Sequence, residues 1–485
     1  MQTDILIIGA GVVGCALARV LSRYEADIVV AEAGPDVASG ATRANSGIVH
    51  AGFDAKPGSL KAVLNVRGAG MYPQLSQELG FPYRQCGALV LGFTPEDEEV
   101  LHLLLEQGKA NGVPGVCLLG REEVLRLEPN TNPDVRLALY APTSGITSPY
   151  EAAYAMADHA AVNGVRFLFG SRITGVRRGD DGLWHARLGG TEIVCRILVN
   201  CAGMGSAEIH NSLCSEPLRL IPRRGQYHLL DRTAELPFSR TMFQCPTRMG
   251  KGVLVSPTVH GNLLLGPSAE DIEDADDTAT TADVLSAVLE TCRLTWPGAS
   301  VRGGITNFAG IRAHEEKGDF VIGAVPGQPG AYETVGIESP GLSAAPAIAE
   351  MLGAQIAADF GLAPKARVLP PVPMAKRFAE MTDEERARAV AEDPAYGRVV
   401  CRCEVVTEAE IRQAIRRPVG AASIDAVKRR TRAGMGRCQG GFCSPRVAEI
   451  LSEELCIPLT QVTKFGGGSR LLTGTLRQDG EEAVL

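Results

Sequence analysis

The sequence lacks a hydrophobic run that could cross a membrane, because no stretch approaches the ~18 consecutive apolar residues that a spanning helix needs. Its apolar beginning also lacks the basic residues that open a signal peptide, and Asp4 stands in their place. The chain has no excess of positive charge either, and its net charge of −8 argues against a nucleic-acid-binding protein. We therefore expect a cytoplasmic protein that does not bind nucleic acid. Peripheral contact with the inner face of a membrane stays open.

The composition is that of an ordinary soluble protein, with 45% hydrophobic and 21% charged residues. A chain of 485 residues is too long for one simple core, so two or three domains are expected. Thirteen cysteines occur without a secretion signal, which makes a disulfide framework an unlikely use for them. Nine are scattered through apolar or mixed surroundings, and most of these are expected to be small buried hydrophobic residues.

The first 32 residues contain the pattern that organises the rest of the chain. An apolar strand ends in G-x-G-x-x-G at Gly9, Gly11 and Gly14, a helical segment follows, and a second strand leads to Glu32. The three glycines suit a tight turn, close approach of a pyrophosphate, and close packing of helix and strand. The helix N-terminus attracts phosphate, and Glu32 can accept hydrogen bonds from a ribose diol. We predict a dinucleotide-binding βαβ unit; the alternative is a glycine-rich turn in an ordinary βαβ unit.

The nucleotide-binding core is predicted to be interrupted twice. Residues 81–136 change to short strands and an acidic helix over 95–111, and residues 218–306 are β-rich. Between them, Ser148 and Pro149 are expected to open a helix that runs to Asn163 and ends at Gly164. A glycine-rich turn at Gly341 feeds another helix N-terminus, where an electron-rich ligand could bind. Residues 362–397 are first proline-rich and then charged, and are interpreted as a linker.

Four further segments point to a family. They are N-S-G-I-V-H-A-G at 45–52, K-P-G-S-L-K at 56–61, A-G-I-R at 309–312 and S-P-G-L at 339–342. Together with the N-terminal motif, they resemble the D-amino-acid-oxidase-like superfamily of FAD-dependent oxidoreductases, over about residues 1–365. Within it, the chain is similar to the large subunits of anaerobic glycerol-3-phosphate dehydrogenases and to L-2-hydroxyglutarate dehydrogenases.

The resemblance implies an α/β fold: a discontinuous Rossmann-like FAD-binding domain with an inserted, antiparallel β-rich substrate domain. The FAD-binding part would comprise about 1–80, 140–217 and 307–365, and the substrate part about 81–139 and 218–306. A linker (366–397), a small helical iron–sulfur domain (398–460) and a tail (461–485) would follow. The residues expected to contact FAD are Gly9, Gly11, Gly14, Glu32, Arg43, Asn45, Ser46, Ile173, Gly203, Gly341 and Leu342.

The remaining four cysteines form the pattern C-x-C at Cys401 and Cys403 and C-x4-C at Cys438 and Cys443. This resembles the bacterioferritin-associated-ferredoxin-like domain. Four thiolates can hold zinc or a [2Fe-2S] cluster, since both use Cys₄ sites. The asymmetric spacing and a flavin on the same chain favour the cluster, with zinc or an unmetallated site as alternatives. The basic run 428–432 is either a solvated helix face or a docking patch.

The resemblance also implies the chemistry, which is oxidation of a small anionic 2-hydroxy compound by hydride transfer to FAD. Arg312 would bind the anionic group, and His50 would take the hydroxyl proton. The alternatives are a surface or structural ion-pair role for Arg312, and packing or hydrogen bonding to the cofactor without proton transfer for His50. Further pocket candidates are Gln226, Tyr227, His228, His314 and Lys317.

A flavin and a cluster on one chain favour a dehydrogenase that passes electrons to a protein or quinone acceptor. The resemblance implies other oxidoreductase subunits in a heteromeric complex, as in the family. We expect glycerol 3-phosphate, oxidised to dihydroxyacetone phosphate, as the first substrate candidate and L-2-hydroxyglutarate as the second. An amino-acid or opine dehydrogenase, or a non-catalytic electron-transfer subunit, are the remaining alternatives.

Overall fold

The computed structural model describes residues 1–232, 236–246 and 252–474. Contacts along the chain divide it into a first unit, Met1–Ala33 with Val37–Met374, and a second unit, Gly34–Asp36 with Ala375–Leu485. The two units are described separately below.

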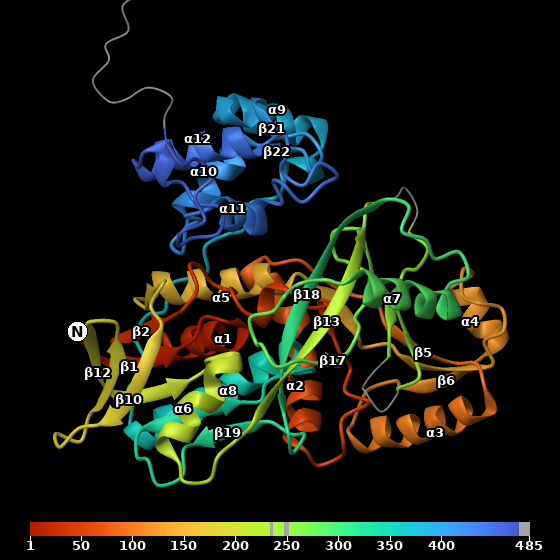
Figure 1. The fold of residues 1–485 in the computed structure, drawn as a ribbon, viewed down its shortest axis with the longest axis horizontal. Coiled ribbons are helices and arrows are strands. Elements are labelled where there is room, and N and C mark those ends of the chain that lie inside the picture. The colour runs from red at the N-terminus through yellow and green to blue at the C-terminus, as the bar shows by residue number, and fades with distance from the viewer. Residues whose placement is uncertain (233–235, 247–251, 475–485) are drawn as a thin grey trace, which may run out of the picture. The chain divides into compact units, whose positions relative to one another are not determined.

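The first unit contains a mostly parallel sheet around β1 (Gln2–Ile8), the strand that precedes the glycine motif (Figure 1). β1 pairs in parallel with strands on both sides, and the apolar residues 5–8 are buried, as expected for a parallel sheet covered on both faces. The strand order is β10 (Ile173–Arg178), β11 (Trp184–Leu188), β12 (Thr191–Asn200), β1, β2 (Ile28–Ala31) and β9 (Arg166–Leu168), with β20 (Ala331–Val335) on β12 and β19 (Val321–Ala324) on β20.

Helices pack closely beside this sheet. All residues of α1 (Val12–Leu21) are buried, and α1 packs against α5 (Pro149–Val162) and α8 (Gly341–Phe360). α2 (Leu60–Leu79) packs on α8 so tightly that a Cβ on Gly68 would lie 2.1 Å from the Ser343 carbonyl oxygen. α6 (Ser206–Leu213) follows β12. In the part of the chain that the structure describes, no helix is long and apolar enough to cross a membrane.

A second sheet of the first unit joins the two predicted insertions. Its order is β17 (Glu270–Asp271), β13 (Leu220–Leu230), β16 (Leu263–Gly266), β15 (Leu254–Pro257), β14 (Thr241–Gln244), β5 (Ala88–Gly92), β7 (Leu137–Ala141) and β6 (Cys117–Gly120), with β18 (Gly304–Glu315) on β13. The pairs are antiparallel except β14–β5, which is parallel. That parallel pair links strands of the two insertions within a sheet that is otherwise antiparallel, as predicted.

Further elements complete the first unit. Helices α3 (Pro95–Ala110), α4 (Arg121–Leu127) and α7 (Ala282–Thr295) pack on the second sheet (Figure 1). A small sheet of β3 (Ile48–Val49), β8 (Gly145–Thr147) and β4 (Tyr83–Gln85) lies apart from the two large ones. The predicted helix over 95–111 corresponds to α3, whose N-cap Thr94 forms a capping box with Asp97.

β18 corrects the predicted division of the chain. Residues 307–365 were assigned to the FAD-binding part, but β18 pairs with β13 from Leu220↔Glu315 to Leu230↔Gly304 in the second sheet. The continuous antiparallel pairing holds the strand there, and Arg312 therefore projects from the substrate sheet. The helix after Ser148 begins at Pro149 as predicted, although the Ser148 side chain makes no capping hydrogen bond.

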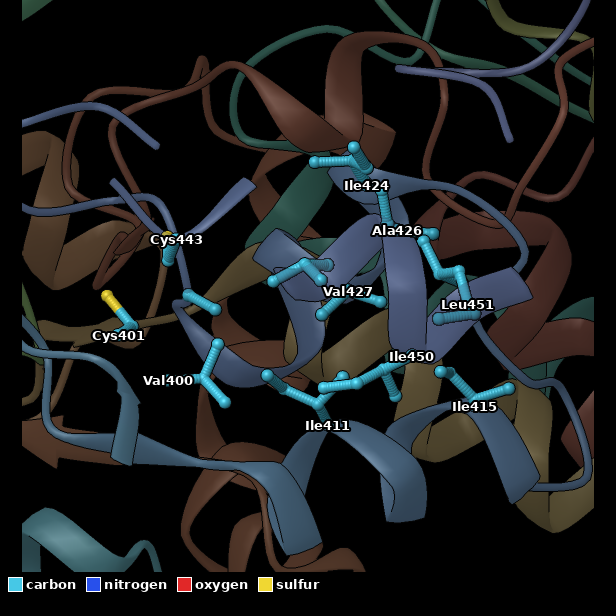
Figure 2. Close-up of a cluster of buried hydrophobic side chains, with 14 of the residues drawn as sticks. Val400, Cys401, Ile411, Ile415, Ile424, Ala426, Val427, Cys443, Ile450 and Leu451 are labelled. Atoms are coloured by element: carbon cyan, nitrogen blue, oxygen red, sulfur yellow. The ribbon is translucent and has the colours of Figure 1, made fainter. Parts of the chain in front are cut away.

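The second unit is a small helical domain with a buried apolar core. It contains β21 (Val399–Cys401), β22 (Val406–Thr407), α9 (Asp383–Glu392), α10 (Glu408–Arg416), α11 (Ile424–Thr431) and α12 (Ser444–Leu455). The core residues come from α10, α11, α12 and the segment around β21. Figure 2 shows Cys401 and Cys443 at one end of this cluster and Ile415 and Leu451 at the other.

The predicted linker and tail are shorter in the structure. Residues from Ala375 onward belong to the second unit, because Phe378 and Tyr396 stack at 6.0 Å and cluster with Ala409. Lys365 and Leu369 hydrogen-bond to Asn163 in the first unit. Val462 lies in the second unit's core, and the carbonyls of Thr463 and Lys464 accept hydrogen bonds from the Ile424 and Asp425 N–H groups, so the start of the predicted tail is held against this unit. The rest of the predicted tail, 475–485, lies outside the described residues.

The contact between α2 and α8 yields a stability prediction. We expect Gly68→Ala to lower the free energy of unfolding by about 1–3 kcal/mol, because the new methyl group overlaps the Ser343 carbonyl. Gly70→Ala is the matched control: it lies in the same helix, is exposed and has nothing within 4 Å of its Cβ position. The control should be neutral or slightly stabilising, by up to ~1 kcal/mol. Urea unfolding of the full chain, followed by circular dichroism, measures both. Equal stability of the two variants contradicts the prediction.

Candidate functional site

A cavity of about 1330 Å³ in the first unit is lined by residues from both large sheets. This volume exceeds the 300–1,000 Å³ of most small-molecule pockets, so the cavity has room for a dinucleotide and a small substrate together. It brings together nearly all the predicted site residues of this unit, which are Gly9, Gly11, Glu32, Arg43, Asn45, Ser46, His50, Ile173, Gly203, Arg312, Gly341 and Leu342.

Gly14 is the predicted cofactor residue that does not line the cavity, and its role is packing. A Cβ on Gly14 would lie 2.0 Å from the Gly9 carbonyl oxygen, and one on Gly9 would lie 2.4 Å from the Cys201 carbonyl. Gly9 also has φ +104°, in the region that favours glycine. Gly11 is the N-cap of α1 and lines the cavity itself. The motif therefore forms a tight turn that exposes a helix N-terminus to the cavity.

Glu32 lies where the second strand reaches the cavity. Its Oε2 accepts a hydrogen bond of 2.7 Å from the Ala10 backbone N–H, which holds the carboxylate beside the glycine turn. Thr42, a residue that the sequence analysis missed, accepts a 3.0 Å hydrogen bond from the Val12 N–H through Oγ1. The arrangement of helix N-terminus, glycine turn and acid fits the pyrophosphate and ribose of a dinucleotide.

The loop after Thr42 is held between the two sheets. Asn45 organises it from within, since its Oδ1 accepts from Gly47 N–H at 2.9 Å and its Nδ2 donates to the Thr42 carbonyl at 3.0 Å. The Ser46 hydroxyl lies 3.1 Å from the Tyr227 hydroxyl on β13. A Cβ on Gly310 of β18 would lie 1.9 Å from the Ala44 carbonyl oxygen. The loop backbone therefore lies directly against the substrate sheet.

His50 lies in the cavity near the start of α8. Its backbone N–H donates to Ser343 Oγ at 2.7 Å, and its ring lies 5.8 Å from that of Phe243. The Nε2 atom is 3.5 Å from Ser339 Oγ, a weak contact. Ser339 and Phe243 also line the cavity and were not predicted, although Ser339 belongs to the S-P-G-L segment. The imidazole is therefore placed to contact a bound molecule.

Arg312 faces the cavity without a carboxylate partner among the described residues. Its Nη2 atom donates a long hydrogen bond of 3.4 Å to the Ser268 carbonyl. The guanidinium lies over Gly225, where a Cβ would come within 2.6 Å of Nη2. Among the described residues, the structure therefore gives no support to a structural ion pair for Arg312. A cation held in this way can bind an anionic group.

Glu338, which also lines the cavity, is paired with two other charged or titratable residues. Glu338 binds Lys61 Nζ at 2.7 Å and His314 Nδ1 at 2.8 Å. Burial opposes ionisation of Glu338, but the Lys61 ammonium and the hydrogen bonds from both partners outweigh it and lower the pKa of the carboxyl. His314 therefore has a structural partner rather than a free place in the pocket.

Of the other pocket candidates, one lines the cavity and the others do not. Tyr227 lines the cavity and stacks on Phe308 with ring centroids 4.7 Å apart. Gln226 is fully buried and bonds to Glu270, so it supports the sheet. The remaining two, His228 and Lys317, are not among the cavity-lining residues.

In the second unit the four predicted ligand cysteines form two pairs. Cys403 and Cys438 are exposed, with their Sγ atoms 3.9 Å apart, and Cys401 and Cys443 are buried. A hydrogen bond from Cys443 outweighs burial and lowers the pKa of Cys401 to about 6. A hydrogen bond from the Phe442 backbone lowers the pKa of Cys438. These shifts favour the thiolate, the form that binds metal, at Cys401 and Cys438. The hydrogen bond to Cys401 raises the pKa of the Cys443 thiol, so one proton is shared by that pair.

The pairwise arrangement bears on the choice of metal. Among the described residues, no group of three or more His, Cys, Asp or Glu side chains is arranged to hold a single metal ion. Zinc needs all four sulfurs about 2.3 Å from one point, whereas a two-iron cluster divides its ligands between two irons. A donor set of four cysteines arranged in two pairs fits a [2Fe-2S] cluster.

Part of the basic run 428–432 is paired within the second unit, so this part is not a solvated helix face. Arg432 donates to Glu404 at 2.7 Å. The Arg430 guanidinium donates to the Val419 carbonyl within the unit. These arginines are used to support the fold around the cysteine loops. The alternative of a docking patch stays a prediction.

Comparison with known proteins identifies the class. Residues 4–355 match the family of FAD dependent oxidoreductases (DAO), and residues 399–453 match the BFD-like [2Fe-2S] binding domain. Because the first match covers most of the chain, the chain belongs to the DAO family of FAD-dependent oxidoreductases. The predicted cofactors, FAD and a [2Fe-2S] cluster, are confirmed at this level.

Within this family, the chain is similar to proteins that act on glycerol 3-phosphate. The chain is 43% identical to a glycerol 3-phosphate dehydrogenase of Caloramator mitchellensis over 98% of this chain and 99% of that protein. It is 31% identical to a glycerol 3-phosphate oxidase of Mycoplasma pneumoniae over 72% of this chain and 93% of that protein. The structure of the L-alpha-glycerophosphate oxidase from M. pneumoniae, with FAD bound, superposes with a TM-score of 0.74 at 29% identity, covering 78% and 100% of the two chains.

The four cysteines yield a prediction about iron. We expect Cys438→Ser to abolish or strongly reduce the iron and acid-labile sulfide bound per chain, because it removes one thiolate from a Cys₄ site. Cys456→Ser is the matched control, since Cys456 is an exposed cysteine of the same unit outside the two pairs. Iron analysis of anaerobically purified protein, together with visible absorbance, measures the effect. Full iron content in Cys438→Ser contradicts the assignment of this ligand.

Proposed function

We propose that the chain is an FAD- and iron–sulfur-dependent glycerol 3-phosphate dehydrogenase. The observation that carries the proposal is the Arg312 guanidinium, which faces the cavity without a carboxylate partner among the described residues while His50 faces the same cavity. The similarity over nearly the full length to a protein named glycerol 3-phosphate dehydrogenase supports this choice of substrate. A phosphate monoester is an anion that a guanidinium binds in a fixed, forked geometry.

The cofactor contacts follow from the cavity lining. We propose that Gly9, Gly11 and Glu32 hold the pyrophosphate and ribose, and that Arg43, Asn45 and Ser46 lie along the flavin. Gly341 and Leu342, at the N-terminus of α8, offer backbone N–H groups to the electron-rich edge of the ring. Ile173 and Gly203 complete the set near the adenine end. Bound FAD supplies the hydride acceptor.

In the proposed reaction, Arg312 binds the substrate phosphate and so orients the secondary hydroxyl. His50 accepts the hydroxyl proton while the hydrogen on the same carbon leaves with its electron pair as hydride. The carbon is oxidised to a ketone, which makes dihydroxyacetone phosphate the product. The substrate thus loses one proton and one hydride, and His50 is the group on this chain that holds the proton.

We propose that electrons leave from the second unit to a separate protein acceptor. The exposed pair Cys403 and Cys438 would place one side of the cluster at the surface of this unit. Beside it, Phe442 is 63% exposed, and the Arg402 guanidinium lies 4.7 Å from the centre of its ring. An aromatic ring and cations at the edge of a redox centre fit an acidic protein better than a small uncharged quinone.

The substrate assignment is tested by anaerobic titration of the intact holoprotein. We expect glycerol 3-phosphate to bleach the flavin absorbance, followed by loss of the cluster absorbance. Glycerol, which lacks the anion that Arg312 binds, should leave both bands unchanged at the same concentration. Bleaching by L-2-hydroxyglutarate but not by glycerol 3-phosphate would transfer the assignment to the second candidate. No bleaching by either compound would overturn the proposal.

The role of His50 is tested by replacing it with a side chain of similar polarity that cannot accept the proton. We expect His50→Asn to lower the rate of flavin reduction by glycerol 3-phosphate by about 10²–10⁴-fold, the usual effect of losing a general base. Stopped-flow absorbance measures the rate, and the FAD content should be unchanged. His102→Asn is the control, since His102 is exposed on α3. An unchanged rate in His50→Asn would leave His50 with a packing role.

A further inference from the structure

A second arginine faces the cavity beside Arg312. In the antiparallel register of β13 and β18, Arg223 lies directly opposite Arg312, and Asp271 of β17 lies opposite Arg223 on its other side. Directly opposite residues point to the same face of a sheet, so the three side chains form a row across three strands. Both arginines line the cavity. The sequence analysis did not single out Arg223.

The next residue of β13, Arg224, points to the opposite face of the sheet and is not available to the cavity. Successive residues of a strand point to opposite faces, and Arg224 is buried on the other face. There it donates to Glu270 at 3.0 Å and to Asp277 at 2.5 Å. Arg224 therefore supports the sheet, and Arg223 is the member of the pair that is available to the cavity.

Asp271 fixes the Arg223 guanidinium without using all its donors. The Nε and Nη2 atoms donate to the two carboxylate oxygens at 2.6 and 3.1 Å. A guanidinium has five N–H donors, so the Nη1 donors stay available on the side away from Asp271. These hydrogen bonds raise the pKa of Arg223, which keeps it charged. The other carboxylate near the row, Glu338, is already bound by Lys61 and His314.

We propose that Arg223, held in place by Asp271, is the second guanidinium of a phosphate subsite and makes the enzyme select phosphate monoesters over carboxylates. The inference rests on the proposed function and names the residue that would decide between its two substrate candidates. A carboxylate offers one charge and two oxygens, which a single arginine fork satisfies. A phosphate monoester carries a charge of about −1.5 to −2 near pH 7 and has three acceptor oxygens. Arg312 matches either anion, and the addition of Arg223 matches the phosphate.

Asp271 acts as a positioning residue in this arrangement. It does not need to touch the substrate, since it binds Arg223 from the neighbouring strand. The carboxylate orients the guanidinium before the substrate arrives, which reduces the ordering cost of binding. An amide at the same position would still accept a hydrogen bond from Arg223 but would supply no charge and a single acceptor oxygen.

The test compares inorganic phosphate with L-lactate, a 2-hydroxy carboxylate, as competitive inhibitors of flavin reduction in the holoenzyme. We expect Arg223→Gln to raise the inhibition constant of phosphate and the KM of glycerol 3-phosphate by about 10- to 100-fold, the usual effect of losing a charged hydrogen bond. The inhibition constant of L-lactate and kcat should change by less than about threefold, because Arg312 and His50 are retained. Asp271→Asn should give a smaller change in the same direction.

Arg219→Gln is the matched control. It removes the same charge from a residue that precedes β13 and makes only an exposed, 3.8 Å ion pair with Glu316, so phosphate inhibition should be unchanged. Direct binding of inorganic phosphate, followed by perturbation of the flavin spectrum, separates the subsite from the reaction. Phosphate binding that depends on Arg223 in an enzyme that does not oxidise glycerol 3-phosphate would overturn the proposed function and leave the subsite in place.

Either of two outcomes with Arg223→Gln would overturn the subsite itself. One is an unchanged inhibition constant of phosphate in Arg223→Gln. The other is an equal weakening of phosphate and L-lactate, which would assign Arg223 a general electrostatic effect without selectivity. If Arg223→Gln loses FAD, Arg223→Lys is measured in its place. Lysine keeps the positive charge but lacks the forked guanidinium, so we expect phosphate to bind more weakly than to the unmodified enzyme. L-lactate should bind as well as it does to the unmodified enzyme. Unaltered phosphate binding in Arg223→Lys that retains FAD would also overturn the inference.

Discussion

The close approach of two backbone segments at Gly310 is the constraint on which the geometry of the site depends. A Cβ at Gly310 would lie 1.9 Å from the Ala44 carbonyl oxygen, so only a glycine lets the loop of the nucleotide-binding part lie against β18. That loop carries Ser46 and leads to His50, and β18 carries Arg312 two residues after Gly310. The contact therefore brings the groups proposed to bind the anion and to take the proton to one cavity.

The long pairing of β13 with β18 extends this constraint across the substrate sheet. Its register places Gly225 opposite Gly310, and the Arg312 guanidinium occupies the space above Gly225. The same register places Arg223 opposite Arg312 and directs Arg224 to the other face, where it pairs with Glu270. The charges of the cavity are thus arranged by strand register, because a shift of one residue would exchange the two faces.

In the second unit, the cysteine site has one buried side and one exposed side. Cys401 and Cys443 end the apolar core, while Cys403 and Cys438 are exposed beside Phe442. Burial on one side restricts water, and exposure on the other side shortens the distance to an external electron acceptor. Arg432 of the basic run stabilises the loops around this site through its ion pair with Glu404.

Local patterns in the sequence determined the glycine turn, the helix after Ser148, the acid at Glu32 and the four cysteines, because each depends on residues close together in the chain. Only the tertiary structure decided that Gly14 packs rather than lines the cavity, that β18 joins the substrate sheet, and that residues 375–397 fold with the second unit. The tertiary structure also decided that Arg223 faces the cavity and that Arg224 is buried on the other face of the sheet. These outcomes depend on pairing between segments far apart in the chain, and neither composition nor spacing records which strands become neighbours.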